Sequence, residues 1–241
     1  SSIIYAESYL GKKYKQKIND TYISGIYYYT KFGLNKKILA IISLILFVST
    51  YSLFFLMIQS NTITEILNIN KYILSFIIII LLILLITNET NQISKLLNKI
   101  VPIMCLFFII ISLYTILKHS HLLPNIFKQI IENAFNIKTM FIGMLIGIKR
   151  SIFLNELLIG TTSMSSGINN EDTEITANTL TIGTYFITFI ISTLVALLVL
   201  IYMYYNGSPN ISYNDLLIQV FNFHFNTFGN YFLGIIVSLL A

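Results

Sequence analysis

Residues 147–156 have the sequence Gly-Ile-Lys-Arg-Ser-Ile-Phe-Leu-Asn-Glu, and Gly160 follows shortly after. This stretch places Lys149, Arg150 and Glu156 among apolar residues, beside a segment apolar enough to enter a membrane. Charged side chains are costly in lipid, so at such positions they usually serve a transport pathway, a gate or a helix end. Two interpretations are open here: a gate network at the cytoplasmic face, or a helix terminus with ordinary interfacial charges.

The composition of the chain indicates a membrane protein. Hydrophobic residues make up 56% of the sequence and charged residues only 10%, whereas soluble domains carry about 25% charged residues. Residues 39–58 contain no charge, and residues 73–87 are almost entirely Ile and Leu. The sequence therefore predicts an all-α protein that crosses the membrane several times and excludes an ordinary soluble domain.

Apolar segments locate the expected membrane spans. They are predicted at about 38–58, 72–87, 101–117, 180–204 and 228–241. Between the third and fourth, residues 140–161 combine glycines with charges, a pattern typical of a broken helix. Gly143 and Gly147 fit either an unwound segment or close helix packing through small residues. Because both ends of the chain fall in apolar segments, we expect a fragment of a longer transmembrane domain.

The distribution of basic residues predicts the orientation. If the region 140–161 crosses once, eleven of the fifteen Lys and Arg residues fall on the side of the loop 11–37, and four on the other. The positive-inside rule then puts this loop in the cytoplasm of a multi-pass protein of the cell membrane. Anionic lipid headgroups could also bind these lysines, with the same topology. The acidic residues Glu171, Asp172 and Glu174 predict a solvated loop.

Several segments resemble one known family in the right order. The stretch from Gly147 to Gly160 resembles the G-[VI]-K-R-G-x-[FY]-S-N-E-A-G-x-G motif of the alanine or glycine:cation symporter family. Other short matches span nearly the whole chain. They are Tyr5-Ala6-Glu7 with Y-A-E, Gly25-Ile26-Tyr27-Tyr28 with G-P-M-Y-Y, Gly33-Leu34 and Lys37 with G-L-G-K-K, Gln59-Ser60-Asn61-Thr62-Ile63 with Q-S-N-S-I, Val101-Pro102-Ile103-Met104 with V-P-F-M, Ala134-Phe135 with A-F, and Thr188, Thr193 and Ala196 with the helix after the signature.

The resemblance implies a fold and a function. The fold would be a partial LeuT-like bundle of two inverted five-helix repeats, truncated at both ends. The function would be sodium- or proton-coupled symport of alanine or glycine, with Na⁺ as the coupling ion. In such bundles the substrate lies at mid-membrane between broken helices, whose N-termini face its carboxylate. The family's first broken helix and its sodium-binding hydroxyls would lie outside this chain, so we expect an incomplete cation site and no catalytic residues.

The resemblance also implies candidate site residues. Gln59 and Asn61 would contact substrate, although hydrogen bonding at a helix end is the alternative. Phe55 would wall a small pocket, with lipid or helix packing as the alternative. The substrate-binding candidates are Phe55, Gln59, Asn61, Gly143 and Gly147, and the candidates for the signature or gate are Lys149, Arg150, Asn155, Glu156 and Gly160.

Departures from the family pattern support a second hypothesis. Leu53, Phe55 and Leu56 stand where the family has glycines and Asn. Ser151, Leu154, Leu157 and Leu158 replace Gly, Ser, Ala and Gly around the signature. Bulky residues where backbone approaches a substrate narrow or close the site. The chain could therefore be a non-functional, truncated remnant of such a transporter.

Two other classes of membrane protein have weaker support. A membrane enzyme would need intramembrane His or clustered Asp, which the sequence lacks, and a channel would need a polar face along a helix. His119-Ser120-His121 has no acidic or Cys partner nearby in the sequence, so a metal site is not favoured. The partners that we expect are a small neutral amino acid and membrane lipid.

Overall fold

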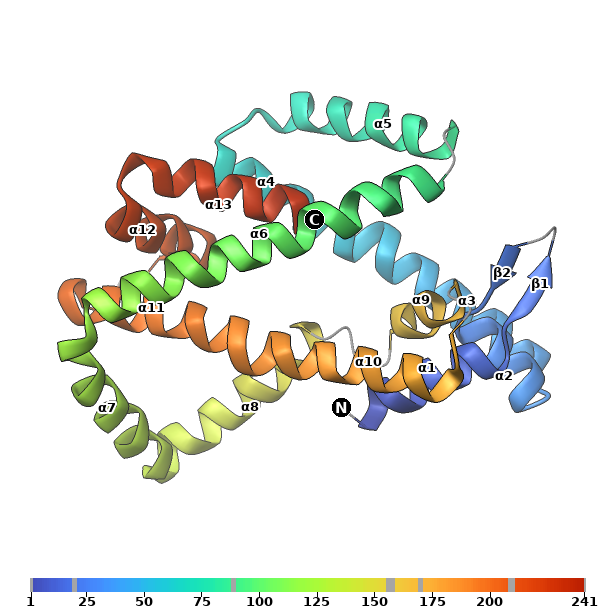
Figure 1. Ribbon diagram of the computed structural model, residues 1–241, viewed down its shortest axis with the longest axis horizontal. Coiled ribbons are helices and arrows are strands. Elements are labelled where there is room, and N and C mark those ends of the chain that lie inside the picture. The colour runs from blue at the N-terminus through green and yellow to red at the C-terminus, as the bar shows by residue number, and fades with distance from the viewer. Residues whose placement is uncertain are drawn as a thin grey trace. The chain divides into compact units, whose positions relative to one another are not determined.

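The computed structural model describes residues 2–18, 21–87, 90–154, 159–168, 171–207 and 211–240 (Figure 1). The described chain is mostly helical, as the composition predicts. Three of its helical stretches are long and apolar enough to cross a membrane: Lys37–Leu67, Lys99–Lys118 and Thr173–Asn206. These features are those of an all-α membrane protein.

The observed helices extend beyond the predicted spans. The predicted spans 38–58, 101–117 and 180–204 lie inside these three stretches, and the predicted spans 72–87 and 228–241 coincide closely with single helices at Lys71–Thr87 and Thr227–Leu240. The apolar pattern marks only the part of a helix that lipid can accept. Polar residues such as Gln59 and Asn61 continue the helix because neither residue breaks it.

The chain forms two compact units, and each is described by itself. Unit 1 comprises Ser1–Tyr51 and Phe127–Thr193, and unit 2 comprises Ser52–Ile126 and Leu194–Ala241. Unit 1 contains α1 (Ser2–Lys13), β1 (Gln16–Ile18), β2 (Thr21–Ile23), α2 (Ile26–Gly33), α3 (Lys37–Ser49), α8 (Ile137–Leu154), α9 (Thr161–Ile168), α10 (Thr173–Phe186) and η3 (Ile187–Ile191). Unit 2 contains α4 (Leu56–Leu67), α5 (Lys71–Thr87), α6 (Thr90–Lys118), η2 (Ser120–Leu122), α12 (Tyr213–Phe225), α13 (Thr227–Leu240) and nearly all of α11 (Ser192–Asn206). The elements η1 (Thr50–Phe55) and α7 (Leu123–Phe135) cross the boundary between the two.

In unit 1, α1 packs against α9 and α10, and β2 also contacts α9. The strands β1 and β2 form an antiparallel hairpin in which Lys17 pairs with Tyr22. The sequence analysis treated residues 11–37 only as a basic loop and did not predict this hairpin. Its β-branched and aromatic residues favour strand structure, and the Lys15 ammonium lies 4.0 Å from the centre of the Tyr22 ring, a cation–π contact.

Two membrane-length helices each contain a widened π turn. The first, η1, joins α3 to α4, and the second, η3, joins α10 to α11. The Thr50 hydroxyl donates to the Leu46 carbonyl oxygen at 2.8 Å, a side-chain bond that favours helix distortion. Single π turns occur often at functional sites. The first lies at Leu53 and Phe55, where the sequence lacks the family's glycines.

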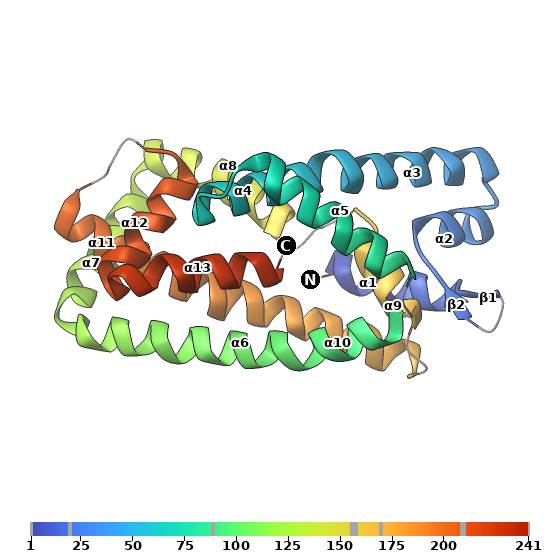
Figure 2. The ribbon, with the colours of Figure 1, turned by 90° about the horizontal axis from the view of Figure 1, so that it is seen from above.

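In unit 2, aromatic side chains pack α12 and α13 together, side by side in Figure 2. Phe221 is buried, and its ring centre lies 6.2 Å from that of Phe232 on α13. The chain reverses at Asn226, which has the left-handed backbone angle φ 53°. Gly229 then lies so close to the Phe221 carbonyl that a side chain would overlap with it. These contacts form a tight helical hairpin.

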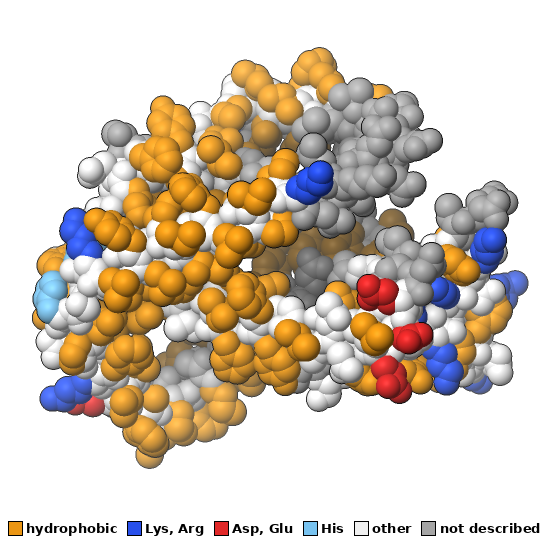
Figure 3. Space-filling view, in the orientation of Figure 1, with side chains coloured by type: hydrophobic (Ala, Val, Ile, Leu, Met, Phe, Trp, Pro, Cys, Tyr) orange, Lys and Arg blue, Asp and Glu red, His pale blue; other side chains and the backbone are white. Residues whose placement is uncertain are grey.

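Large apolar side chains remain exposed throughout the described chain, for example Ile38 and Phe135, which are 77% and 83% exposed. On the face shown in Figure 3, hydrophobic side chains cover most of the visible length of α6. Exposed apolar surface of this extent would aggregate in water and is expected where lipid or further helices cover it.

Candidate functional site

Within the region 140–161, where a broken helix was predicted, the first helix ends at Leu154 and the next begins at Thr161. Helix α8 runs from Ile137 to Leu154 through both Gly143 and Gly147. A methyl group added at either glycine would meet nothing within 4 Å among the described residues. The interruption predicted for residues 140–161 therefore does not fall at these two glycines, because glycine weakens a helix by only about 1 kcal/mol relative to alanine.

The charged signature residues lie near the end of this helix. Lys149 and Arg150 are exposed on α8. Asn155 and Glu156 lie outside the described residues, so a gate network of these residues stays a prediction. Gly160 is described, and its φ of 108° lies in the region that favours glycine. A Cβ atom there would lie 3.2 Å from the Phe47 ring, a tight contact, so the backbone conformation is the main reason for glycine at this position.

Helix α9 begins directly after Gly160 and is held against α1 and β2 by small residues. A Cβ atom on Gly11 of α1 would overlap with the backbone of Ser163, and one on Gly167 would overlap with Ser24. The Ser24 hydroxyl donates to the carbonyl oxygens of Ser163 and Met164, the latter at 3.2 Å. Small side chains on both sides thus allow the backbones to approach closely, and a side-chain hydroxyl donates hydrogen bonds to backbone carbonyl oxygens at the contact. We call this contact between α1, β2 and α9 the small-residue junction.

A buried lysine borders the small-residue junction. Lys12 is only 5% exposed, and its ammonium donates to the Thr176 hydroxyl of α10 at 3.2 Å. Burial lowers the pKa of Lys12, and the charge of Lys15 lowers it further, whereas Glu171 and Asp172 oppose both effects. The acidic residues are exposed, as predicted for a solvated loop, but they also compensate a buried charge.

A second polar pair lies on the same part of α1. Glu7, from the Y-A-E match, is 7% exposed. Burial raises the pKa of Tyr29 on α2 to about 12, and the nearby Glu7 carboxylate contributes to that shift. Tyr29 therefore stays neutral at physiological pH beside a buried acidic side chain.

A cavity of about 300 Å³ opens beside the start of α9 in unit 1. Hydroxyl groups form its polar wall, and no ionisable side chain is among its described lining residues. The lining residues are Ile4, Leu154, Thr161, Thr162, Ser165, Leu180, Thr184 and Ile187. Ser165 and Thr184 donate their hydroxyl protons to backbone carbonyls, at 3.1 and 2.9 Å. Each hydroxyl oxygen can still accept a hydrogen bond, so this hydroxyl-lined cavity suits a small, neutral polar molecule.

The sequence analysis did not identify the cavity. The residues that follow Gly160, Thr-Thr-Ser-Met-Ser-Ser, are unusually rich in hydroxyls and could have indicated it. The other polar contributor, Thr184, is distant in sequence and gave no signal of its own.

The remaining predicted substrate residues lie in unit 2. Phe55 ends η1, and Gln59 and Asn61 lie on α4. The Asn61 amide donates to the Glu65 carboxylate at 2.8 Å, and that carboxylate also accepts from Asn214 of α12. Because α4 continues to Leu67, Asn61 does not end the helix, and its substrate role stays a prediction. Gly143 and Gly147 belong to unit 1, so the five predicted substrate residues are divided between the two units.

A metal centre has no support in the described part of the chain. Among these residues, no group of three or more His, Cys, Asp or Glu side chains could hold an ion.

Comparisons with known proteins agree with the resemblance seen in the sequence. The profile of the sodium:alanine symporter family matches residues 1–241. The chain is 26% identical to the amino-acid carrier protein AlsT of Bacillus subtilis (strain 168), over 82% of this chain and 45% of the carrier. It is 25% identical to an uncharacterized transporter of Haemophilus influenzae (strain ATCC 51907 / DSM 11121 / KW20 / Rd), over 100% of this chain and 53% of the transporter. The chain thus spans about half the length of these relatives. No solved structure matches it significantly.

Proposed function

Because the chain belongs to the sodium:alanine symporter family, we propose that it forms part of a secondary active transporter for alanine or glycine. The family and its named relatives are transporters, not enzymes. The coupling ion in this proposal is Na⁺, with H⁺ as the alternative. The protein would lie in the cell membrane with the loop 11–37 in the cytoplasm, as the excess of lysine predicts. The fold would be part of a LeuT-like bundle of two inverted five-helix repeats.

The hydroxyl-lined cavity is the observation that carries this proposal. Its neutral polar wall and its size suit a small zwitterion without a charged side chain. The cavity also adjoins α9, which begins directly after the signature glycine. We place it on the substrate path, with Thr162, Ser165 and Thr184 as contact residues. The proposed substrate residues outside this cavity remain Phe55, Gln59, Asn61, Gly143 and Gly147. The proposed gate consists of Lys149, Arg150, Asn155 and Glu156.

Transport by the intact protein tests the proposal. Proteoliposomes under an inward sodium gradient should accumulate labelled alanine or glycine transiently above equilibrium. Replacing both Thr162 and Thr184 with valine should reduce uptake about thirtyfold, since each lost hydrogen bond contributes about 1 kcal/mol. Thr179→Val is the matched control, because Thr179 is exposed and its hydroxyl, among the described residues, bonds only to the Ile175 carbonyl. If neither a sodium nor a proton gradient drives accumulation, the symporter proposal fails.

One residue of the cavity favours the alternative, a transporter remnant without activity. Leu154 lines the cavity where the resembling motif has a serine. A bulky apolar group there narrows the space and removes a hydroxyl. If the wild-type protein does not transport, the variant Leu154→Ser tests whether this leucine alone is the cause. Uptake gained by this change would indicate a site closed by the leucine, and continued inactivity would support a remnant that has lost more than one feature.

A further inference from the structure

The positive charge of the chain is concentrated in one segment of unit 1. Residues 11–37 contain seven lysines and one aspartate, a net charge of +6, whereas the whole chain carries +5. On the face shown in Figure 3, Lys and Arg side chains gather over the part of unit 1 that carries α1, α2 and the β hairpin. The remainder of the chain is close to neutral, so this segment is the part that can attract an anionic surface.

Three of these lysines follow one another around the end of α2. Lys31 lies in the last turn of α2. The chain then turns at Asn35, which has the left-handed backbone angle φ 53°. Lys36 precedes α3 and Lys37 begins it, and both side chains are exposed. Because α3 opens the membrane-length stretch Lys37–Leu67, these two lysines lie where a span meets the headgroups of the lipid.

A fourth lysine reaches the same place from the end of α1. Lys13 is exposed, and its ammonium lies 5.8 Å from the centre of the Tyr14 ring. The same ring packs against Gly33, the last residue of α2, where a Cβ atom would lie 3.2 Å from it. The Lys31 ammonium lies 5.0 Å from the centre of the Phe32 ring. Cation–π contacts therefore hold Lys13 and Lys31 beside the end of α2.

The charge of these four lysines is available to a partner. The ion pair that Lys128 forms with Glu132 has no counterpart at any of the four among the described residues. The acidic loop of unit 1 does not change this, because the charges of Glu171 and Asp172 act on the buried Lys12. An anion that approaches the end of α2 therefore meets cations that no described carboxylate neutralises.

Exposed apolar side chains lie among the same lysines. Phe32 is 42% exposed, Leu34 60% and Ile38 77%. A surface that combines cations with exposed apolar groups suits the boundary between lipid headgroups and acyl chains. A nucleic acid would offer phosphates but no apolar layer for Leu34 and Ile38. The combination therefore favours lipid as the partner.

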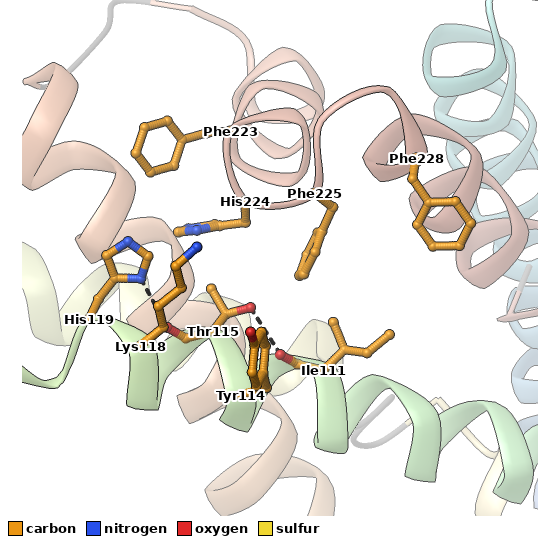
Figure 4. A pocket seen from close by; sticks show the side chains of 9 residues that line it. All are labelled: Ile111, Tyr114, Thr115, Lys118, His119, Phe223, His224, Phe225 and Phe228. Atoms are coloured by element: carbon orange, nitrogen blue, oxygen red, sulfur yellow. Dashed lines mark hydrogen bonds between the residues drawn. The ribbon is translucent and has the colours of Figure 1, made fainter.

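Unit 2 contains a lysine beside aromatic residues in a different setting. Lys118 lines a cavity of about 330 Å³ together with three phenylalanines (Figure 4), and it is the only lysine among the described lining residues. Each lysine near an anionic membrane surface strengthens binding about fivefold. A single lysine is therefore a weak anchor, whereas several together can retain a lipid.

We propose that the end of α2 forms a binding surface for an anionic phospholipid. The ammonium groups pair with the headgroup phosphate, and the apolar side chains contact the upper part of the acyl chains. We call this surface the lysine patch; it consists of Lys13, Lys31, Lys36 and Lys37 with Phe32, Leu34 and Ile38. The lipid lies in the cytoplasmic leaflet under the proposed topology, and its binding does not depend on the proposed transport.

Native mass spectrometry of the purified protein in detergent, with added phosphatidylglycerol or phosphatidylcholine of the same acyl chains, tests the proposal. The wild-type protein should retain the anionic lipid at least about tenfold more strongly. Replacing three exposed lysines of the patch with glutamine (Lys13, Lys36 and Lys37) should abolish most of this preference. The matched control makes the same change at three exposed lysines outside the patch, Lys71, Lys118 and Lys138, and should keep the preference. Excess free glycerol phosphate should not displace the lipid, because it has no acyl chains.

Several outcomes would overturn the proposal. Equal retention of the two lipids by the wild-type protein would show that the patch does not recognise charge. An equal loss of preference in both triple variants would make it an effect of net charge alone. Displacement by glycerol phosphate would show a phosphate site without lipid recognition. Binding of polyglutamate without retention of phosphatidylglycerol would make the patch a contact for an acidic protein segment. Lipid retention by a protein that does not transport would support the patch and contradict only the proposed function.

Discussion

Two sets of glycines in unit 1 have opposite environments. Gly143 and Gly147 of α8 are helical and have open space where a side chain would be. Gly11 of α1 and Gly167 of α9 are also helical, but a side chain on either would overlap with a neighbouring segment. The sequence analysis selected the first pair, because it lies beside the charged signature, and passed over the second. Glycine in a membrane helix therefore indicates neither unwinding nor close packing until its neighbours are known.

The small-residue junction and helix α8 also differ in how far their polar residues are buried. The small-residue junction contains buried hydroxyls, and the buried Lys12 and Glu7 lie on the same helix, α1, whereas the side chains of α8 from Phe141 to Arg150 are exposed. Polar groups buried together restrict how the elements around them can pack. We expect the junction to be sensitive to substitution and α8 to be tolerant.

The largest expected effect is that of Gly11→Ala. The new methyl group would overlap with the Ser163 backbone, which cannot rotate away, so we expect the free energy of unfolding to fall by about 2–3 kcal/mol. SDS-induced unfolding of the purified protein, followed by circular dichroism, measures it. Gly183→Ala is the control, because Gly183 is helical and has nothing within 4 Å among the described residues. Equal stability of the two variants would show that the junction is not tightly packed.

Thr176→Val should have the next largest effect. It removes the hydroxyl that accepts from the buried Lys12 ammonium, and hydrogen bonds to charged groups contribute about 1.5–3 kcal/mol. The same unfolding experiment measures the loss. Thr176 and Thr179 both donate to the carbonyl one turn earlier, at 3.0 and 2.8 Å, so Thr179→Val isolates the lysine bond. Thr176→Ser should retain most of the stability. A loss as large in Thr179→Val would contradict the role of Lys12.

Gly143→Ala should raise the free energy of unfolding, whereas the two previous substitutions lower it. The space around Gly143 is open, and alanine favours a helix over glycine by about 0.5–1 kcal/mol. We therefore expect slightly higher stability in the unfolding experiment. Uptake of alanine by the intact protein provides the second measurement. A stable variant that has lost uptake would support the predicted substrate role of Gly143, and unchanged uptake would leave it as an ordinary helical residue.

At neutral pH the smallest expected effect is that of Tyr29, whose contribution appears only as a pH dependence in alkaline solution. The folded protein raises its pKa from 10.0 to about 12, so its contribution to stability is present below pH 10 and is lost as the pH rises towards 12. Tyr29→Phe should make the stability less dependent on pH in that window. Unfolding at pH 9, 10, 11 and 12 measures this, with Tyr27→Phe as the neighbouring control. An identical pH profile in wild type and Tyr29→Phe would contradict the shift.

Part of the candidate site could be predicted from the sequence. The order of short matches around Lys149 and Gly160 indicated the family, which the profile match over residues 1–241 confirms. Gly160 has a backbone angle that favours glycine, and its neighbours leave little room for a side chain. The cavity next to it could not be predicted as a whole, since Thr162 and Thr184 come from different helices and neither is unusual by itself.

The sequence by itself determined that this is a helical membrane protein, and it located the long apolar helices. Apolar content and the absence of charge are local properties, and lipid requires each span to satisfy its own backbone. Only the tertiary structure decided which helices meet. Lys12 and Thr176 are 164 residues apart in the sequence, and Ser24 and Ser163 are 139 apart. Contacts over such separations depend on the fit of two surfaces, and a local pattern of residue types does not specify that fit.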